Sequence, residues 1–283
     1  MSERAILVRD LRMSYGSMEA VRGISFEVDR GEVFGLLGPN GAGKTSTVEI
    51  LEGYRRRSAG EVAVLGYDPA GRPRTLRERI GIVTQEGGFH PRATVGEAVA
   101  LAALPYPAPR DATETIELVG LTGSSGVRVK ALSGGQRRRL DLALALVGDP
   151  EVLFLDEPTT GFDPQARRGA WEVVRRFSKL GKTVLLTTHY LEEAQALADR
   201  VAILKDGRIV AEGPPGSLGP DTSSYHVSWR ENGGRVEHLT EDPTELLARV
   251  STEALADGRR LEDLRVARPS LEDVYLELTD EAE

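Results

Sequence analysis

One glycine-rich segment of the chain has the spacing of a phosphate-binding loop. It follows an apolar run at 33–37, precedes a helix-like stretch at 44–51, and reads Gly38-Pro39-Asn40-Gly41-Ala42-Gly43-Lys44-Thr45. Glycines let the backbone curl so that several N–H groups point at one anion. We expect Lys44 to reach the β- and γ-phosphates of a nucleotide and Thr45 to bind Mg²⁺. A glycine turn with an incidental lysine is the alternative, but the flanking strand and helix argue against it.

Two adjacent carboxylates, Asp156 and Glu157, end another apolar run at 152–155. In proteins with a phosphate-binding loop, an acid at the end of a second strand helps to hold the metal. We therefore expect Asp156 in the coordination shell of Mg²⁺ and Glu157 beside an attacking water, which it would polarise. This pair favours hydrolysis over transfer of the phosphoryl group to a second substrate. Solvated acids at the end of a strand are the alternative.

A third segment, Leu132-Ser133-Gly134-Gly135-Gln136, comes directly before an amphipathic helical pattern. By itself it could be an N-cap serine and a glycine turn. Together with the two preceding motifs it resembles the signature that separates the ATP-binding-cassette (ABC) ATPases from other proteins with a phosphate-binding loop. The resemblance implies that the chain binds ATP and Mg²⁺. It also implies that Ser133 and Gly135 contact the γ-phosphate held by the loop of a second copy.

Further positions match the family one at a time. Tyr15 would stack on adenine, or else be an ordinary partly buried strand aromatic. Gln85 would sense Mg²⁺ and the attacking water, or else be a polar loop residue. His189 follows an apolar strand, at the edge where ligands bind in open α/β sheets, and resembles the switch histidine that contacts the γ-phosphate. Asp163 belongs to a segment that meets the other subunit, in which Phe162 stands where leucine is more usual.

The resemblance thus implies one nucleotide site assembled from several segments of the chain. The expected catalytic residues are Lys44, Gln85, Glu157 and His189. The expected metal ligands are Thr45, Gln85 and Asp156. The expected nucleotide-binding residues are Tyr15, Val21, Gly38, Pro39, Asn40, Gly41, Ala42, Gly43, Lys44, Thr45, Ser46, Ser133, Gly134, Gly135, Gln136 and Asp163.

An α/β core must bring these segments together. Apolar runs at 33–37, 152–155 and 183–187 resemble central strands of a parallel sheet that is buried on both faces. Residues 5–34 read as short alternating strands, and residues from about 90 to 147 read mainly as helix. The expected fold is the α/β fold of ABC ATPases, with a phosphate-binding loop, an antiparallel β subdomain and a helical insert.

A Gly-Pro-Pro-Gly segment at 213–216 divides the chain. We expect an ABC ATPase domain at 1–215 and a small α+β appendage at 216–283, with a regulatory or dimerisation role. Residues 268–276 resemble the ending of the drug- and antibiotic-export branch of the family. The proline-rich stretch at 105–109 interrupts a helical insert that looks shorter than usual. The resemblance implies that this region contacts the membrane subunit.

The charge of the chain limits the choice of partners. A formal net charge of -8 and a pI near 5.3 give no general attraction to nucleic acid or anionic lipid. The arginine runs at 55–57 and 137–139 are better explained as solvated ends of helices. No apolar stretch approaches the roughly 20 residues that span a bilayer, and residues 1–10 lack the apolar core of a secretion signal. We therefore expect a cytoplasmic protein, attached to the membrane through a permease partner, with no nucleic-acid partner.

The favoured function is the ATP-hydrolysing subunit of an ABC transporter that exports a drug-like, antibiotic or lipid-like substrate through a separate membrane subunit. One loop and one signature per chain require a second copy to complete each site. A soluble mechanochemical ABC ATPase is the main alternative, and it would be expected to carry a long coiled-coil insertion or two cassettes. A kinase with a phosphate-binding loop is a third possibility, which Glu157 and the signature disfavour.

Overall fold

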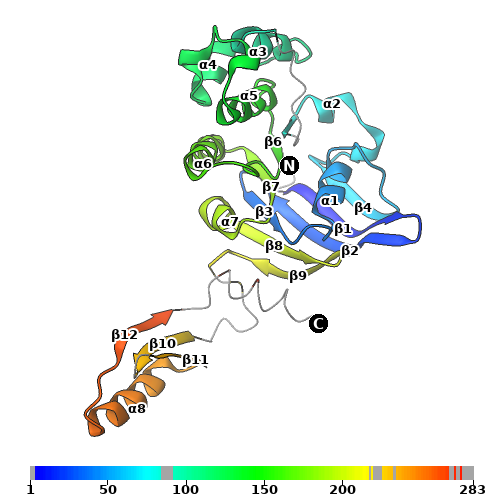
Figure 1. Cartoon of the computed structure of the whole chain (residues 1–283). Coiled ribbons are helices and arrows are strands. Elements are labelled where there is room, and N and C mark those ends of the chain that lie inside the picture. The colour runs from blue at the N-terminus through cyan, green and yellow to red at the C-terminus, as the bar shows by residue number, and fades with distance from the viewer. Residues whose placement is uncertain are drawn as a thin grey trace. The chain divides into compact units, whose positions relative to one another are not determined.

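The computed structural model describes residues 4–83, 92–216, 218, 225–231, 234–267, 271 and 275. The chain divides into two compact units, Met1–Glu212 and Gly213–Glu283. Figure 1 shows the larger unit around a central sheet and the smaller one as a sheet with the helix α8 (Pro243–Ala256). In the part of the chain that is described, no helix has both the length and the apolar character that a membrane crossing requires.

The centre of the larger unit is a six-stranded sheet with the order β5-β6-β7-β3-β8-β9. The adjacent strands from β5 to β8 in this order pair in parallel. The strands β3, β6 and β7 are buried along almost their whole length, as expected for a parallel sheet covered on both faces. The three apolar runs are therefore central strands, as predicted. The bounds are β3 (Val33–Leu37), β5 (Ile80–Val83), β6 (Val152–Asp156), β7 (Thr183–Thr188), β8 (Arg200–Lys205) and β9 (Arg208–Gly213).

An antiparallel sheet with the order β2-β1-β4 lies beside α1 (Lys44–Leu51). The rings of Phe26 on β2 and Phe34 on β3 stack at 5.3 Å, which joins the two sheets. Val48 of α1 belongs to the same buried cluster as residues of both sheets. The loop before α1 is therefore held where the two sheets meet. The bounds are β1 (Arg4–Tyr15), β2 (Met18–Asp29), β4 (Ala59–Val64) and the short α2 (Arg74–Arg77).

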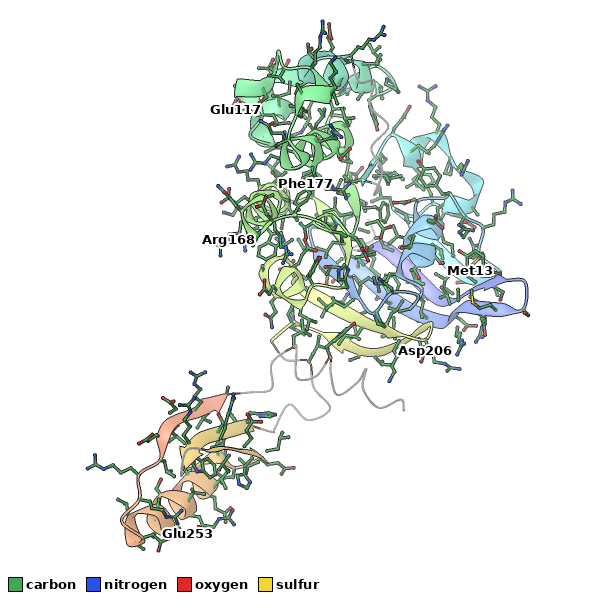
Figure 2. All side chains as sticks on the ribbon, in the orientation of Figure 1. Met13, Glu117, Arg168, Phe177, Asp206 and Glu253 are labelled. Atoms are coloured by element: carbon green, nitrogen blue, oxygen red, sulfur yellow. The ribbon has the colours of Figure 1, made fainter. Side chains whose placement is uncertain are left out.

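Helices cover the other face of the central sheet. Because side chains alternate along a strand, Phe154 of β6 packs with α1, whereas Leu153 and Leu155 pack with α5 (Gly134–Leu146) and α6. Phe177 lies between α6 and the sheet, and Arg168 on the same helix points outward (Figure 2). The two helices that follow β6 and β7 are α6 (Pro164–Lys179) and α7 (Leu191–Leu197).

The insert between β5 and β6 is helical, as predicted. It contains α3 (Val95–Ala103), α4 (Ala112–Leu118) and α5 (Gly134–Leu146). The proline-rich stretch at 105–109 lies between α3 and α4, where no helical hydrogen bond is needed. Both α3 and α5 begin with a capping box, in which an N-cap hydroxyl and the third helical side chain satisfy each other's backbone N–H groups. The predicted α/β class, β subdomain and helical insert are thus confirmed.

The smaller unit is an α+β arrangement. Its antiparallel sheet has the order β11-β10-β12, and Val227 and Trp229 of β10 pack against Leu246 of α8. The stretch at 268–276, which resembles the ending of the export branch, lies outside the described residues, except for Leu271 and Tyr275. The bounds are β10 (Tyr225–Glu231), β11 (Gly234–Thr240), α8 (Pro243–Ala256) and β12 (Glu262–Ala267).

Three charged side chains join the starts of three central strands. Glu151, before β6, accepts hydrogen bonds from Arg79 before β5, at 3.0 Å from Nη2, and from Arg30 before β3, at 2.8 Å. The bonds from Arg79 and Arg30 hold the pKa of Glu151 down at about 2, against partial burial. All three side chains are about one third exposed, so the solvent screens the pair energies.

Glu151→Gln should therefore lower the free energy of unfolding by about 1 kcal/mol at pH 7. A depressed carboxyl pKa contributes stability that is complete above the unfolded value of 4.5 and is lost as the pH falls toward about 2. The difference from wild type should shrink across this window in urea titrations at several pH values. Glu61→Gln, at an exposed glutamate 3.9 Å from Arg9, is the control. A difference that does not change with pH would assign the loss to packing instead.

Candidate nucleotide-binding site

The loop between β3 and α1 has the backbone that phosphate binding requires. Gly43, the N-cap of α1, has φ 103°, and a Cβ atom there would lie 2.6 Å from the carbonyl oxygen of Ala20. Only glycine fits this close approach. No side chain caps the N-terminus of α1, and its first turn holds no acid. The free N–H groups and the positive end of the helix are therefore available to an anion.

Lys44 is buried within this loop, with 4% of its surface exposed. Its ammonium donates hydrogen bonds to the carbonyl oxygens of Gly38 at 2.7 Å and Pro39 at 3.1 Å. Burial lowers the pKa of Lys44, while the negative charges of Glu157 and Asp156 oppose this shift. The ammonium thus has charged partners in a buried environment, where weak screening by solvent makes its attraction for a phosphate strong.

The end of β6 brings the two predicted acids to the same place. Thr187 of β7 donates from its hydroxyl to Asp156 Oδ1 at 2.5 Å and accepts from the backbone N–H of Glu157 at 2.9 Å. Glu157 has φ 45°, in the left-handed region that non-glycine residues rarely adopt. Strained backbone of this kind persists where the surroundings hold it, often at functional sites.

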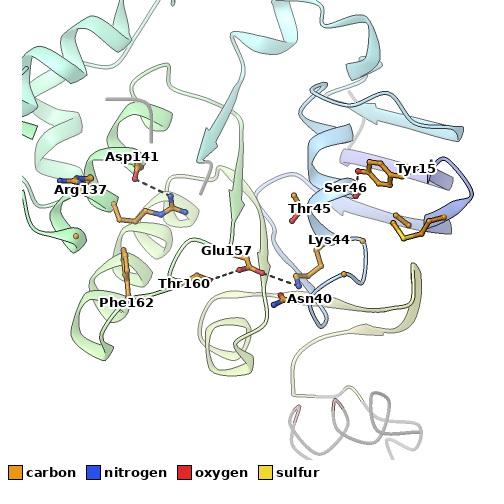
Figure 3. A pocket seen from close by; sticks show the side chains of 16 residues that line it. Tyr15, Asn40, Lys44, Thr45, Ser46, Arg137, Asp141, Glu157, Thr160 and Phe162 are labelled. Carbon is orange, nitrogen blue, oxygen red and sulfur yellow. Dashed lines mark hydrogen bonds and ion pairs between the residues drawn. The ribbon is translucent and has the colours of Figure 1, made fainter. Parts of the chain in front are cut away.

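The carboxylate of Glu157 is the meeting point of the site (Figure 3). Its Oε1 lies 3.7 Å from the ammonium of Lys44 and 3.4 Å from Nδ1 of His189. Its Oε2 accepts a hydrogen bond from the hydroxyl of Thr160 at 3.1 Å. Nδ1 of His189 is buried and has no hydrogen-bond partner among the described residues. The ammonium of Lys44, the carboxylate of Glu157 and the His189 ring, whose Nδ1 can still form a hydrogen bond, therefore lie close together.

A cavity of about 980 Å³ opens in front of these groups. This volume is that of a large ligand pocket. Tyr15 lies at one side, where its hydroxyl is 2.9 Å from Ser46 Oγ and the guanidinium of Arg55 lies 5.0 Å from its ring centroid. The cavity is lined by Tyr15, Met18, Ala20, Asn40, Gly41, Gly43, Lys44, Thr45, Ser46, Gly134, Arg137, Arg138, Asp141, Glu157, Thr160 and Phe162.

Four of the predicted nucleotide-binding residues in this part of the site do not line the cavity: Val21, Gly38, Pro39 and Ala42. Val21 is fully buried in the core, and the neighbouring Met18 and Ala20 form that part of the wall. Gln85 lies outside the described residues.

The predicted signature residues border a second cavity, of about 670 Å³. The hydroxyl of Ser133 caps α5 by accepting from the N–H of Gln136 at 3.2 Å, and the Gln136 side chain accepts from the N–H of Ser133 at 3.0 Å. The carboxylate of Asp163 caps α6 by accepting from the backbone N–H groups of Gln165 at 2.9 Å and Ala166 at 2.8 Å. Both caps, with Gly134 and Gly135, lie in the wall of this cavity. The signature residues and the phosphate-binding loop thus line mainly different cavities.

The oxygen donors near Lys44 suit Mg²⁺. The Thr45 hydroxyl and the Asp156 carboxylate are hard oxygen ligands, and Mg²⁺ commonly takes only one or two protein ligands and completes its shell with phosphate and water. No group of three or more His, Cys, Asp or Glu side chains that could hold a metal occurs within the described ranges. The Thr45 hydroxyl and the Asp156 carboxylate therefore fit a Mg²⁺ ion that is also bound by the phosphates of a nucleotide.

One sequence-based expectation was wrong. The arginines at 137–139 were expected to be solvated, but Arg138 is only 8% exposed and donates to the carbonyl oxygen of Pro158 at 3.0 Å. Asp141, one turn further along α5, lies 3.7 Å from Arg138. Burial raises the pKa of Asp141 to about 6, and Arg138 opposes that rise. Both residues line the first cavity and were missed, although a basic residue next to the signature and an acid three positions later were visible signals.

Comparison with known proteins agrees with this geometry. A family model described as ABC transporter matches residues 21–160. The Nod factor export ATP-binding protein I of Paraburkholderia xenovorans (strain LB400) is 40% identical, over 99% of this chain and 98% of that protein. Its counterpart in Bradyrhizobium diazoefficiens is 39% identical, over 99% and 97%. A solved structure described as the ATP-binding subunit of an ABC transporter has a TM-score of 0.71 and 24% identity, covers 97% of this chain and 99% of that one, and shows the same fold.

Proposed function

The chain belongs to the ATP-binding subunits of ABC transporters, and we propose that it hydrolyses ATP to drive export through a separate membrane subunit. The observation that carries this proposal is the convergence of Lys44, His189 and Thr160 on the carboxylate of Glu157 beside a phosphate-binding loop. Release of inorganic phosphate by the purified chain, dependent on both ATP and Mg²⁺, is the test. Transfer of phosphate to an acceptor with no free phosphate would instead favour a kinase.

Each side chain has a proposed task in hydrolysis. The N–H groups of residues 38–45 and the ammonium of Lys44 bind the β- and γ-phosphates. Thr45 and Asp156 hold Mg²⁺, which neutralises charge on the phosphates when it is bound. Glu157 accepts a proton from the attacking water. His189 contacts the γ-phosphate, and Gln85 retains its proposed role near the metal on the family resemblance alone.

A second copy would complete each site. The chain has one phosphate-binding loop and one signature, and these lie mainly on the walls of two different cavities. Ser133, Gly135 and Asp163 would therefore serve the ATP held by the partner copy, as in the ABC family. Closure of the two copies around ATP would do the mechanical work, and one copy alone would bind ATP but hydrolyse it slowly.

The direction of transport rests on the relatives, whose names describe export of Nod factor. We propose that this chain likewise serves an exporter of a drug-like, antibiotic or lipid-like substrate. It would attach to the cytoplasmic face of the membrane through a permease, with the appendage at 216–283 regulating or dimerising the subunit. Purification of the tagged chain from membranes should bring down a hydrophobic protein with about six spans of ~20 apolar residues. ATP hydrolysis stimulated by DNA or RNA, without a membrane partner, would favour the mechanochemical alternative.

Tyr15→Ala should raise the KM for ATP about tenfold, because stacking of a base on an aromatic ring contributes roughly 1–3 kcal/mol. Tyr15→Phe should keep the KM near wild type, since it retains the ring and loses only the contact to Ser46. Inhibition by tripolyphosphate, which has no base, should be unchanged in both. Tyr54→Ala is the matched control, because Tyr54 is 61% exposed and also faces an arginine, Arg72. Equal losses in Tyr15→Ala and Tyr15→Phe would assign the effect to the hydroxyl.

A further inference from the structure

Arg138 connects the helix that follows the signature to the strand end that carries Glu157. Its Nε donates to the carbonyl oxygen of Pro158 at 3.0 Å, and its Nη2 lies 3.4 Å from the carbonyl oxygen of Asp156. These two carbonyl groups flank Glu157 on either side along the chain. The Nε–Nη2 edge of the planar Arg138 guanidinium therefore contacts the backbone on both sides of Glu157, the proposed general base.

The backbone at Glu157 needs such support. Its φ of 45° is costly for a residue with a side chain. On the N–H side it is held by the hydroxyl of Thr187, from β7. Arg138 supplies the second hold from a different element, α5. The direction of the Glu157 carboxylate thus depends on contacts from two separate parts of the fold.

Arg138 itself is fixed in place. Its side chain is 9% exposed, and the carboxylate of Asp141, 3.7 Å away, is 13% exposed. A buried guanidinium is tolerated only where its charge and donors are matched, and here the backbone carbonyls and Asp141 provide that match. Such a side chain cannot swing freely, so a shift of α5 must move either the guanidinium or the carbonyl groups that it holds.

We propose that Arg138 is a positioning residue for hydrolysis, which aims Glu157 at the attacking water and makes that aim depend on the position of α5. Residues 133–136 begin α5, so engagement of the signature by the nucleotide of a second copy is transmitted through the first turns of this helix to Glu157. The inference rests on the proposed ATPase function. It explains why a buried arginine lies beside a motif whose own residues contact another site.

The test compares Arg138→Met and Arg138→Lys with wild type in the full-length chain. The kcat for ATP hydrolysis should fall about 10- to 100-fold in Arg138→Met, the size expected when a reacting group is displaced by about 1 Å. Arg138→Lys keeps the charge but not the two-donor edge, and it should be intermediate. The kcat should fall far more than the Kd for ATP rises, because Arg138 lines the cavity but the loop at 38–45, which holds the phosphates, is untouched. Arg74→Met is the control, since it removes an exposed arginine paired with Glu78.

A double variant separates positioning from general loss of structure. If Arg138 acts through Glu157, then Arg138→Met should cause no further loss in a Glu157→Gln background, measured as slow release of radiolabelled phosphate. Losses that multiply, or a wild-type kcat in Arg138→Met, would overturn the inference. If Arg138→Met does not fold, Arg138→Lys decides in the same way. A wild-type chain without any ATPase activity would instead refute the proposed function.

Discussion

Glu157→Gln should lower ATP hydrolysis by about 1,000-fold while ATP binding is retained. A positioned general base contributes roughly 100- to 10,000-fold, and an amide cannot accept the proton of the attacking water. Glutamine keeps the size of the side chain and an oxygen that can accept the hydrogen bond from Thr160. It also removes a negative charge 3.7 Å from Lys44, so repulsion of the phosphates falls and bound ATP should persist. Phosphate release measures the lost hydrolysis, equilibrium binding measures the retained ATP, and molar mass by light scattering measures whether the ATP-bound chains form a dimer.

A nearby glutamate provides the control for that substitution. Burial, assisted by the charges of Asp156 and Glu49, raises the pKa of Glu52 to about 8. Glu52→Gln therefore removes little charge at pH 7, and its hydrolysis rate should stay within about twofold of wild type. The Glu157→Gln chain should form a dimer when ATP is added and fall apart without it. A variant that binds ATP and remains a monomer would count heavily against closure of two copies around the nucleotide.

Sequence reasoning located the central strands and the loop because their signals are local. Runs such as 152–155 carry the uniform apolar character of strands buried on both faces, and the helix start at Lys44 follows directly from the glycine pattern. The order of the strands could not be predicted in this way, because β3 lies between β7 and β8, which come about 150 residues later. No short-range pattern encodes such a neighbourhood.

The residues misplaced or missed from the sequence depend on register and on distant partners. Val21 was expected at the nucleotide, but it alternates into the core, so its neighbour Ala20 lines the cavity instead. Arg138 was expected in solvent but is buried. Its partners are backbone carbonyl groups about 20 residues further along the chain, and the types of the side chains in the sequence do not reveal them. Thr187 reads as one more residue of an apolar strand until its hydroxyl is seen between Asp156 and Glu157.

Two inactive variants, Lys44→Met and Ser133→Asp, should regain activity when they are mixed. Lys44→Met removes the ammonium of the phosphate-binding loop, and each variant alone should hydrolyse ATP at about 1% of the wild-type rate or less. Ser133→Asp keeps a good N-cap for α5 but places a negative charge where the γ-phosphate of the partner's ATP would lie. In a mixed dimer, one site carries both changes and the other carries neither.

An equal mixture should therefore recover up to about a quarter of the wild-type rate, since half of the dimers are mixed and each has one intact site. The two chains are mixed without nucleotide, ATP and Mg²⁺ are added, and phosphate release is followed. Lys44→Met mixed with Glu157→Gln is the control: both groups act on the same ATP, so every site in that mixture is damaged. Recovery in the first mixture only would place the loop and the signature of one chain in different sites. Recovery in neither mixture while dimers form would mean that each chain builds its site alone. Recovery in both would mean that Lys44 and Glu157 of one chain act on different ATP molecules.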